Sequence, residues 1–261
     1  MHAFPPFNQV KDCKYGKVLF NTRDIYVGKS FELYGEFSDA EVELFQQMIK
    51  PDDVVVDIGA NIGAHTLYFA RAVGPRGAVL AFEPQRIVYQ TLCANMALNS
   101  VTNAYCFHAA VGQTPGQILV PPLDYNREGN YGGLGLGEFQ QGEQVQVLPI
   151  DGLGLGRCKL LKVDVEGMER EVLMGCALTI QRLSPILYVE NDRDDKSADL
   201  IRYIDSIGYK MFWHRPPLYN PNNFFKNPQN VFGNVVSLNM LCVPKSATTN
   251  LTGFPPVEVP A

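Results

Sequence analysis

From residue 53 onward, short apolar runs of strand length alternate with longer stretches of helical periodicity. The apolar runs are 53–58, 77–83, 104–109, 159–165 and 185–190, and the helical stretches are 61–73, 85–99, 166–182 and 195–207. This alternation is typical of βαβ units, whose parallel strands are apolar on both faces because helices cover both. It predicts a doubly wound, mostly parallel α/β sheet. In such sheets ligands bind beyond the carboxyl ends of the strands.

The segment before this alternation predicts a small N-terminal addition. Residues 17–37 alternate apolar and polar side chains around residues 21–24, which predicts a β-hairpin. Ser38 and Glu41 have the spacing of a capping box, which predicts a helix that runs to about Ile49.

The length and composition fit one large domain with additions. The chain has 261 residues, 46% of them hydrophobic and 19% charged, and no linker-like stretch divides it. We expect the hairpin and helix over 1–50, the main domain over 51–245, and a loosely held tail over 246–261.

The charge balance and apolar pattern exclude several classes of partner. The net charge is -5 without a dense Lys/Arg run, so we do not expect a nucleic-acid substrate. The start of the chain has no secretory pattern, and no run of about 18 apolar residues occurs. These features predict a cytoplasmic protein with no membrane span. They do not predict its oligomeric state.

A candidate cofactor turn follows the first apolar run. Residues 54–66 read VVVDIGANIGAHT: Asp57 lies near the end of the strand, and Gly59, Asn61 and Gly63 form a tight turn into a helix. Glycines let the backbone approach a ligand, and the turn presents amide groups at the helix start. The spacing alone also fits a dinucleotide site or a plain turn. Asp57 favours an ammonium group over a pyrophosphate.

The next two strand ends extend this candidate pocket. Glu83 and Pro84 close the run 77–83, where an acid is placed to accept hydrogen bonds from two ribose hydroxyls. Ala109 or Ala110 would leave space for adenine, although small residues at a strand end have an equally ordinary explanation. The set of acids and glycines therefore predicts a pocket for adenosine joined to an amino acid, which describes S-adenosylmethionine.

The fourth apolar run contains a lysine that needs a partner. Residues 160–175 read LLKVDVEGMEREVLMG, and alternation puts Lys162 and Asp164 on one face of the strand. A lysine inside a central strand is costly unless it is paired, so Asp164 or Asp151 is expected beside it. Asp164 would also lie beside the methionine part of the cofactor. The acids that follow, Glu166 among them, are expected to serve the helix N-terminus.

The ordered series of motifs resembles the FkbM family of methyltransferases. These motifs are VVVDIGANIG, AFEP, VQVLPIDGL, LLKVDVEGMEREVLMG and PILYVENDR, which together cover roughly residues 50–193. The resemblance implies a class I methyltransferase fold, a Rossmann-like sheet of seven strands whose last strand, about 235–243, is antiparallel. It also implies methyl transfer, usually to oxygen. At the position of His65 an aromatic or other residue is common in the family, so the resemblance assigns no role to it.

Transfer to an alcohol makes a base useful, and three residues are candidates. They are Asp164, Glu190 at the end of LYVE, and His214 near the end of a later strand. Each has an alternative: Asp164 could orient the cofactor or pair with Lys162, Glu190 could anchor a loop, and His214 could pack. No ligand spacing demands a metal, so none is expected, although an ion at Asp164, Glu190 or Asp192 is left open.

The loop over residues 213–234 is the expected acceptor site. Aromatic rings beside amides suit a polyhydroxylated ligand, since rings cover C–H faces while amides bind hydroxyls. The candidate substrate residues are Trp213, Tyr219, Asn222, Asn223 and Phe224. An Asn/Pro turn cluster with aromatic anchors is the alternative.

We therefore predict O-methylation of a small-molecule or glycan acceptor, most simply a hydroxyl of a carbohydrate or another polyhydroxylated metabolite. N-methylation of a peptide side chain or amine is the alternative within the methyltransferases. An NAD-type oxidoreductase, which should carry the full G-x-G-x-x-G, and a non-catalytic nucleotide-fold binding module are the alternatives from other classes.

Overall fold

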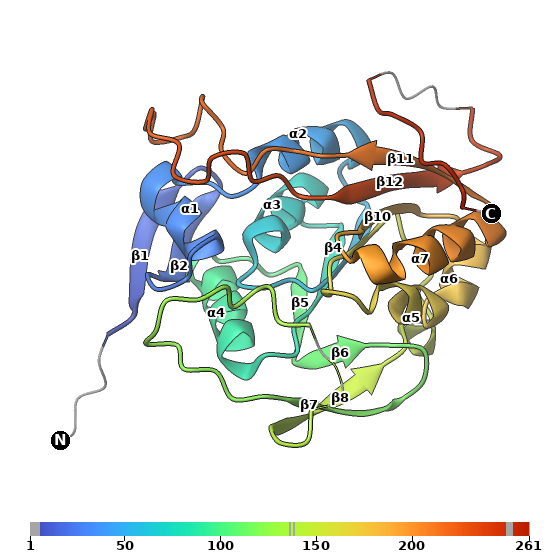
Figure 1. The fold of residues 1–261 in the computed structure, drawn as a ribbon, viewed down its shortest axis with the longest axis horizontal. Helices are drawn as coiled ribbons and strands as arrows, with labels where there is room; N and C mark the ends of the chain where they lie inside the picture. The colour runs from blue at the N-terminus through green and yellow to red at the C-terminus, as the bar shows by residue number, and fades with distance from the viewer. Residues whose placement is uncertain (1–5, 136, 138, 249–252, 261) are drawn as a thin grey trace.

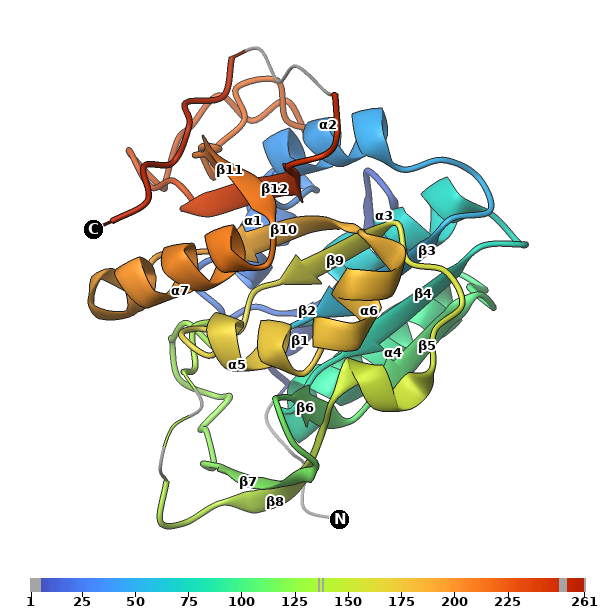
Figure 2. The ribbon, with the colours of Figure 1, turned by 90° about the vertical axis from the view of Figure 1, so that its right-hand side faces the viewer.

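A seven-stranded sheet forms the core of the protein. The computed structural model describes residues 6–135, 137, 139–248 and 253–260. The strands are β3 (Val54–Ile58), β4 (Ala78–Phe82), β5 (Ala104–Phe107), β9 (Leu160–Val163), β10 (Ile186–Glu190), β11 (Tyr209–His214) and β12 (Asn239–Pro244). Figure 1 shows the edge strand β11 beside β12, and the order across the sheet is β11-β12-β10-β9-β3-β4-β5 (Figure 2). β12 is antiparallel to both of its neighbours, and the other pairs are parallel. This confirms the predicted doubly wound sheet.

Helices cover both faces of the sheet. One face carries α2 (Asp39–Met48) and α3 (Ala64–Val73), and the other carries α5 (Glu169–Met174), α6 (Ala177–Leu183) and α7 (Asp194–Ser206) (Figure 2). Successive residues of β3 divide between these faces: Val55 packs in the cluster with α2 and α3, whereas Val56 and Ile58 pack with α5 to α7. The same alternation directs Asp57 toward α3. A further helix, α4 (Arg86–Leu98), packs beside β2.

Two predicted elements are interrupted in the structure. The expected strand 104–109 ends at Phe107, and β6 (Ala109–Val111) instead joins β7 (Gly116–Val120) and β8 (Glu143–Leu148) in a separate three-stranded sheet. The expected helix 166–182 is divided at Gly175. A Cβ there would lie 2.1 Å from the carbonyl oxygen of Gly112, so the backbones of the two segments approach too closely for a side chain.

The predicted hairpin over 17–37 is wrong in its position. The hairpin lies earlier, between β1 (Asn8–Cys13) and β2 (Gly16–Asn21), and α1 (Val27–Tyr34) follows it. The buried residues Val27, Phe31 and Tyr34 recur at intervals of four and three. That is the period of a helix, which outweighs the apparent alternation over the same residues.

The capping box predicted for α2 does not form, although the helix does. Ser38 has a φ of 46°, and its hydroxyl donates to the carboxylate of Glu41 at 2.7 Å rather than serving as a helix cap. Glu41 is buried and belongs to the wall of the main cavity.

Part of the tail that was expected to be loosely held pairs with β11. The amide of Trp213 donates to the carbonyl of Pro255 at 2.8 Å, and the amide of Val257 donates to Met211 at 2.9 Å. The expectation is therefore wrong for this part of the tail, while residues 249–252 and 261 lie outside the described part of the chain. No helix among the described residues is both long and apolar enough to cross a membrane.

Candidate active site

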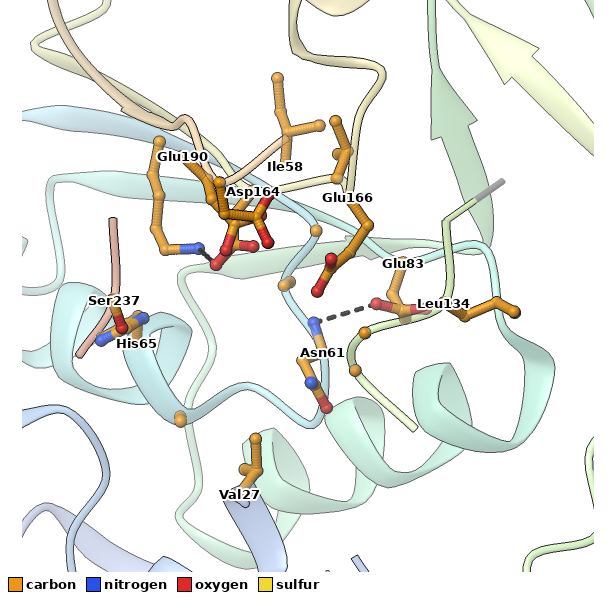
Figure 3. A pocket seen from close by; sticks show the side chains of 18 of the residues that line it. Val27, Ile58, Asn61, His65, Glu83, Leu134, Asp164, Glu166, Glu190 and Ser237 are labelled. Carbon is orange, nitrogen blue, oxygen red and sulfur yellow. Dashed lines mark hydrogen bonds and ion pairs between the residues drawn. The ribbon is translucent and has the colours of Figure 1, made fainter. Parts of the chain in front are cut away.

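A cavity of about 450 Å³ lies at the carboxyl ends of the central strands (Figure 3). Residues that follow β3, β4, β9 and β10 form its floor, as expected for a doubly wound sheet. Its remaining walls come from α1, α2 and α3, from residues 130–134, and from the stretch 235–239 that precedes and begins β12.

Glu83 is held at the edge of this cavity by two backbone amides. Its Oε1 accepts from the amide of Gln85 at 2.8 Å, and its Oε2 accepts from the amide of Asn61 at 3.0 Å (Figure 3). Burial raises the pKa of Glu83 to about 7, and the hydrogen bonds from the two backbone amides oppose that shift. Pro84 and Ala110 line the cavity beside it. The predicted cofactor residues Asn61, Glu83, Pro84 and Ala110 thus lie together.

The two predicted turn glycines have different surroundings. Gly59 lines the cavity at a φ of 80°, and a Cβ there would lie 1.7 Å from the carbonyl oxygen of Asp164. Gly63 is not among the lining residues, and a Cβ there would lie 2.6 Å from Leu92 on α4. Gly59 therefore brings β3 and β9 together at the site, whereas Gly63 permits packing of α4 against the turn.

Asp57 does not reach the cavity surface, contrary to the expected contact with an ammonium group. It is fully buried, and its Oδ2 accepts from the hydroxyl of Thr66 at 2.6 Å. Its Oδ1 lies 3.7 Å from the ammonium of Lys162. Because alternation along β3 turns Asp57 toward α3, its carboxylate lies beneath the turn and does not project beyond the strand end.

The buried lysine has the partner that the sequence predicted. The ammonium of Lys162 lies 2.9 Å from Asp164. The alternative partner, Asp151, instead accepts from the amide of Thr179 at 2.8 Å, at the start of α6. Burial alone would raise the pKa of Asp164, but the adjacent Lys162 lowers the pKa below its usual value. Asp164 therefore faces the cavity as a carboxylate.

Glu190 and Glu166 complete a group of carboxyls around Asp164 (Figure 3). Burial, and then the charge of Asp164, raises the pKa of Glu190 well above its usual value. Glu166 lines the cavity and pairs with Arg193, so its assignment to the helix N-terminus was wrong. Asp164, Glu166 and Glu190 each offer an oxygen within 4.8 Å of the others, an arrangement that could hold a cation. Lys162 and Arg193 already supply positive charge beside it.

Sequence reasoning missed two buried residues that line the opposite wall. Glu41 on α2 and His65 on α3 are 4% and 6% exposed, and both contribute to the cavity surface. The atoms Nε2 of His65 and Oε2 of Glu41 lie 3.7 Å apart. The sequence pattern places Glu41 in a capping box and gives no role to His65. Each of these two residues is a titratable side chain among the apolar positions of a core-facing helix. That pattern is the sequence signal that could have identified both as candidate site residues.

His214 does not belong to the cavity, so its prediction as a base is wrong. Its Nδ1 lies 2.8 Å from the hydroxyl of Tyr188, and its ring packs against Phe254. Burial lowers the pKa of His214 to about 4. The residue therefore has the packing role that was its alternative interpretation.

The five predicted substrate residues also lie outside the cavity lining. These are Trp213, Tyr219, Asn222, Asn223 and Phe224. Asn223 is buried, and its side chain donates to the carbonyls of Asn220 and Asn227. Tyr219 packs its ring on Tyr34 of α1. The alternative interpretation, a structural turn with aromatic anchors, fits the contacts of Asn223 and Tyr219.

Only the flanks of that loop reach the site. Leu218 and the stretch 235–239 line the cavity, together with Tyr26 and Val27 from the region of α1. Leu218 and Phe232 of the loop also pack with Tyr34 of α1, and this packing holds the loop beside the cavity.

Comparisons with known proteins identify the family of this chain. The family model described as a methyltransferase FkbM domain matches residues 57–211. Methyltransferase 1 of Beauveria bassiana (strain ARSEF 2860) is 32% identical over 177 residues, which cover 58% of this chain and 71% of that protein. The 31-O-demethyl-FK506 methyltransferase FkbM of Streptomyces tacrolimicus is 27% identical over 236 residues, covering 78% and 86% respectively.

A solved structure shares the fold. The methyltransferase FkbM from Methylobacillus flagellatus KT matches with a TM-score of 0.50 and 18% identity. The match covers 77% of this chain and 50% of that one, so this chain spans about half the length of the solved protein.

Proposed function

The chain belongs to the FkbM methyltransferase family and is a methyltransferase that uses S-adenosylmethionine, and we propose that it methylates a hydroxyl group of a carbohydrate or another polyhydroxylated metabolite. The observation that carries the proposal is a single cavity with two chemically different ends. One end contains the backbone-held Glu83, and the other contains Glu41 and His65, with the carboxyls of Asp164 and Glu190 between them (Figure 3).

The residues present fit S-adenosylmethionine. Glu83 is fixed by two backbone amides and keeps further lone pairs for ribose hydroxyls, and the small side chain of Ala110 lines the cavity. The carboxylate of Asp164 would favour a positively charged sulfonium. A volume of about 450 Å³ lies in the range of ordinary small-molecule sites. When bound, the cofactor supplies an electrophilic methyl group.

The carboxyl-rich wall favours an alcohol over an amine as the acceptor. Asp164, which faces the cavity as a carboxylate, would stabilise an amine in its protonated form, which has no lone pair for attack. A hydroxyl keeps its lone pairs and can donate its proton to an acceptor in the wall. The relative from Streptomyces tacrolimicus is named for a 31-O-demethyl substrate, which supports transfer to oxygen.

A polyhydroxylated acceptor is supported by the hydrogen-bonding groups at the acceptor end. Ser237 and Asn239 line the cavity beside Glu41 and His65, and Asn130 lies on another wall. These side chains can bind several hydroxyls of one small molecule. The aromatic rings expected for this purpose in the loop 213–234 are not among the lining residues, so the proposal rests on this polar wall.

The experiment is a screen with S-adenosylmethionine that carries a labelled methyl group. Carbohydrates and other polyols are incubated first, followed by amines and peptides, and products are identified by mass spectrometry. A labelled ether supports the proposal. A labelled amine or amide instead supports N-methylation, and label on apolar alcohols alone would reject the polyhydroxylated class.

A further inference from the structure

Glu41 contributes a carboxyl group to the acceptor end of the cavity from the first turn of α2. Its Oε1 accepts from the hydroxyl of Ser38 at 2.7 Å and from the side-chain amide of Asn239 at 3.3 Å. Both of these hydrogen bonds hold the same oxygen, so they fix the direction of the carboxyl group. A carboxylate has about four lone pairs on its two oxygens, which leaves Oε2 able to accept a further hydrogen bond.

The second oxygen of Glu41, Oε2, remains for a ligand. It lies 3.7 Å from Nε2 of His65, which is too far for a hydrogen bond. Nε2 of His65 is among the buried atoms that have no partner in the described part of the chain, whereas Oε2 of Glu41 is not among them. Ser237 is a further hydrogen-bonding neighbour of Glu41, and it lies across the cavity from Glu83 (Figure 3). An acceptor hydroxyl bound at Ser237 can therefore reach Oε2.

The charges around Glu41 allow it to change its protonation state near neutral pH. Burial raises the pKa of Glu41 to about 7, while the charge of Lys162 opposes this shift and that of Asp164 adds to it. His65 on α3 is neutral, since burial lowers its pKa to about 3. Burial also raises the pKa of Tyr188 on β10 well above its usual value, so this hydroxyl is neutral too. A base is most effective when its pKa lies near the working pH.

The other carboxyl groups of the cavity are less suited to receive a proton. Asp164 is already in an ion pair and has a lowered pKa, so it is a weak proton acceptor. Glu190 has a strongly raised pKa and holds its own proton. Glu166 is paired with Arg193 and points toward the cofactor end of the cavity (Figure 3). Glu41 thus combines a free oxygen with a position at the acceptor end.

We propose that Oε2 of Glu41 accepts the proton of the acceptor hydroxyl during methyl transfer. This proposal rests on the proposed function, since it requires a hydroxyl acceptor. The O–H bond breaks and its proton moves to Oε2, while an oxygen lone pair forms the bond to the methyl carbon. The electron pair of the broken carbon–sulfur bond remains on sulfur. The negative charge of Glu41 and the positive charge of the sulfonium are lost together, and burial favours the neutral carboxyl group that results.

The first test compares turnover with cofactor binding. Glu41→Gln keeps the shape of the side chain and an oxygen for Ser38 but removes the base. For the hydroxyl acceptor found in the labelled-methyl screen, kcat should fall about 10²- to 10⁴-fold, while the dissociation constant for S-adenosylmethionine changes less than about threefold. Glu43→Gln is the matched control with kcat unchanged, because Glu43 is exposed on the same helix. A fall of kcat in Glu41→Gln of less than about tenfold overturns the proposal.

A more acidic acceptor separates loss of the base from a structural effect of the same variant. A fluorine atom next to the acceptor hydroxyl makes that hydroxyl more acidic, so its proton is lost with less help from a base. The fall of kcat caused by Glu41→Gln should therefore be at least about tenfold smaller with the fluorinated acceptor. An equal fall with both acceptors overturns the proposal.

The last test needs neither a variant nor an acceptor. Carbon NMR of wild-type protein with labelled glutamate side chains, saturated with S-adenosylhomocysteine, should show Glu41 titrating with a midpoint between about pH 6 and pH 8, near its pKa of about 7. A midpoint outside this range overturns the proposal even when no acceptor is found. If Glu41 titrates as expected and the labelled-methyl screen yields amines alone, the hydroxyl acceptor, and with it the proposed function, is what fails.

Discussion

The ammonium of Lys162, buried in the central sheet, lies 2.9 Å from the carboxylate of Asp164, which faces the cavity. Lys162 also lies 3.7 Å from the fully buried Asp57, so one cation compensates two acids. A buried ion pair contributes little beyond what its desolvation costs, but removal of one partner leaves the other charge uncompensated. The fold therefore requires Lys162 because it compensates the negative charges of Asp57 and Asp164.

Replacement of Lys162 by methionine should strongly destabilise the fold. We expect the free energy of unfolding at pH 7 to fall by about 3–5 kcal/mol, because Asp57 and Asp164 lose their shared cation. Urea denaturation measures this change. Lys17→Met removes an exposed lysine that pairs with Asp12 and should cost less than about 1 kcal/mol. Equal effects of the two variants would contradict the argument.

Removal of the carboxylate at Glu83 should weaken cofactor binding. Glu83→Ala is expected to reduce the affinity for S-adenosylmethionine by about 1.5–3 kcal/mol, the range for hydrogen bonds to charged groups, measured by calorimetry. Glu143→Ala is the control, because Glu143 pairs with Arg86 at the surface. Asp57→Asn should affect binding less than Glu83→Ala, since Asp57 does not line the cavity. If Asp57→Asn weakened cofactor binding more than Glu83→Ala does, Asp57 would be a direct ligand of the cofactor.

Cofactor affinity should rise with pH through neutrality. Burial raises the pKa of Glu83 to about 7 in the folded protein, above its ordinary value of 4.5. In the cofactor-free protein this carboxyl therefore contributes stability that is present below about pH 4.5 and lost as pH rises through about 7. The ribose hydroxyls donate to the ionised carboxylate of Glu83, so the affinity for S-adenosylmethionine should be low at pH 5.5 and level off above pH 8. Calorimetry across this range should show a flatter profile for Glu83→Gln, and an identical profile would contradict this assignment.

The middle of the loop 213–234 should be dispensable for turnover. Asn222→Ala and Phe224→Ala are expected to leave both kcat/KM and cofactor affinity nearly unchanged, because neither residue lines the cavity. Asn223→Ala should instead lower the free energy of unfolding by about 1–3 kcal/mol, since it removes the partner of two loop carbonyls. A tenfold fall of kcat/KM in Asn222→Ala would return the loop to the acceptor site.

Methyl transfer should not require a divalent metal. Lys162 and Arg193 already pair with Asp164 and Glu166, two of the three carboxyls that could hold an ion. Dialysis against EDTA should therefore leave the rate unchanged, and elemental analysis should find less than stoichiometric metal. Loss of activity that magnesium or manganese restores would contradict this expectation.

The parallel part of the central sheet could be predicted because its strands carry local signals, whereas the last strand was expected only from the family resemblance. The apolar runs around Val55 and Leu160 are of strand length and are separated by helical periods, and this arrangement leaves few alternatives for the fold. The N-terminal hairpin was misplaced because Val27, Phe31 and Tyr34 fit both an alternating and a helical pattern when no partner is known. Only the packing of α1 decides between them.

Within the site, residues at strand ends were easier to identify than residues on helices. Glu83, Asp164 and Glu190 were predicted to lie near one ligand because carboxyl ends of parallel strands meet at one edge. Glu41 and His65 reach the same cavity from two helices, and nothing in their sequence spacing specifies that approach. The aromatic and amide residues of the loop had the right composition for a ligand. Their direction, however, depends on packing against Tyr34, which is almost two hundred residues away.

The pairing of residues 255–257 with β11 also bears on how the protein behaves at high concentration. β11 is an edge strand of the central sheet, and the unpaired amides and carbonyls of such an edge can recruit a strand from another molecule. Here the amide of Trp213 and the carbonyl of Met211, both on β11, are engaged by residues 255–257. The pairing of residues 255–257 therefore prevents a strand of another molecule from adding to β11. A shortened chain that ends at Lys245 would expose β11, and self-association of otherwise folded molecules is the consequence to expect.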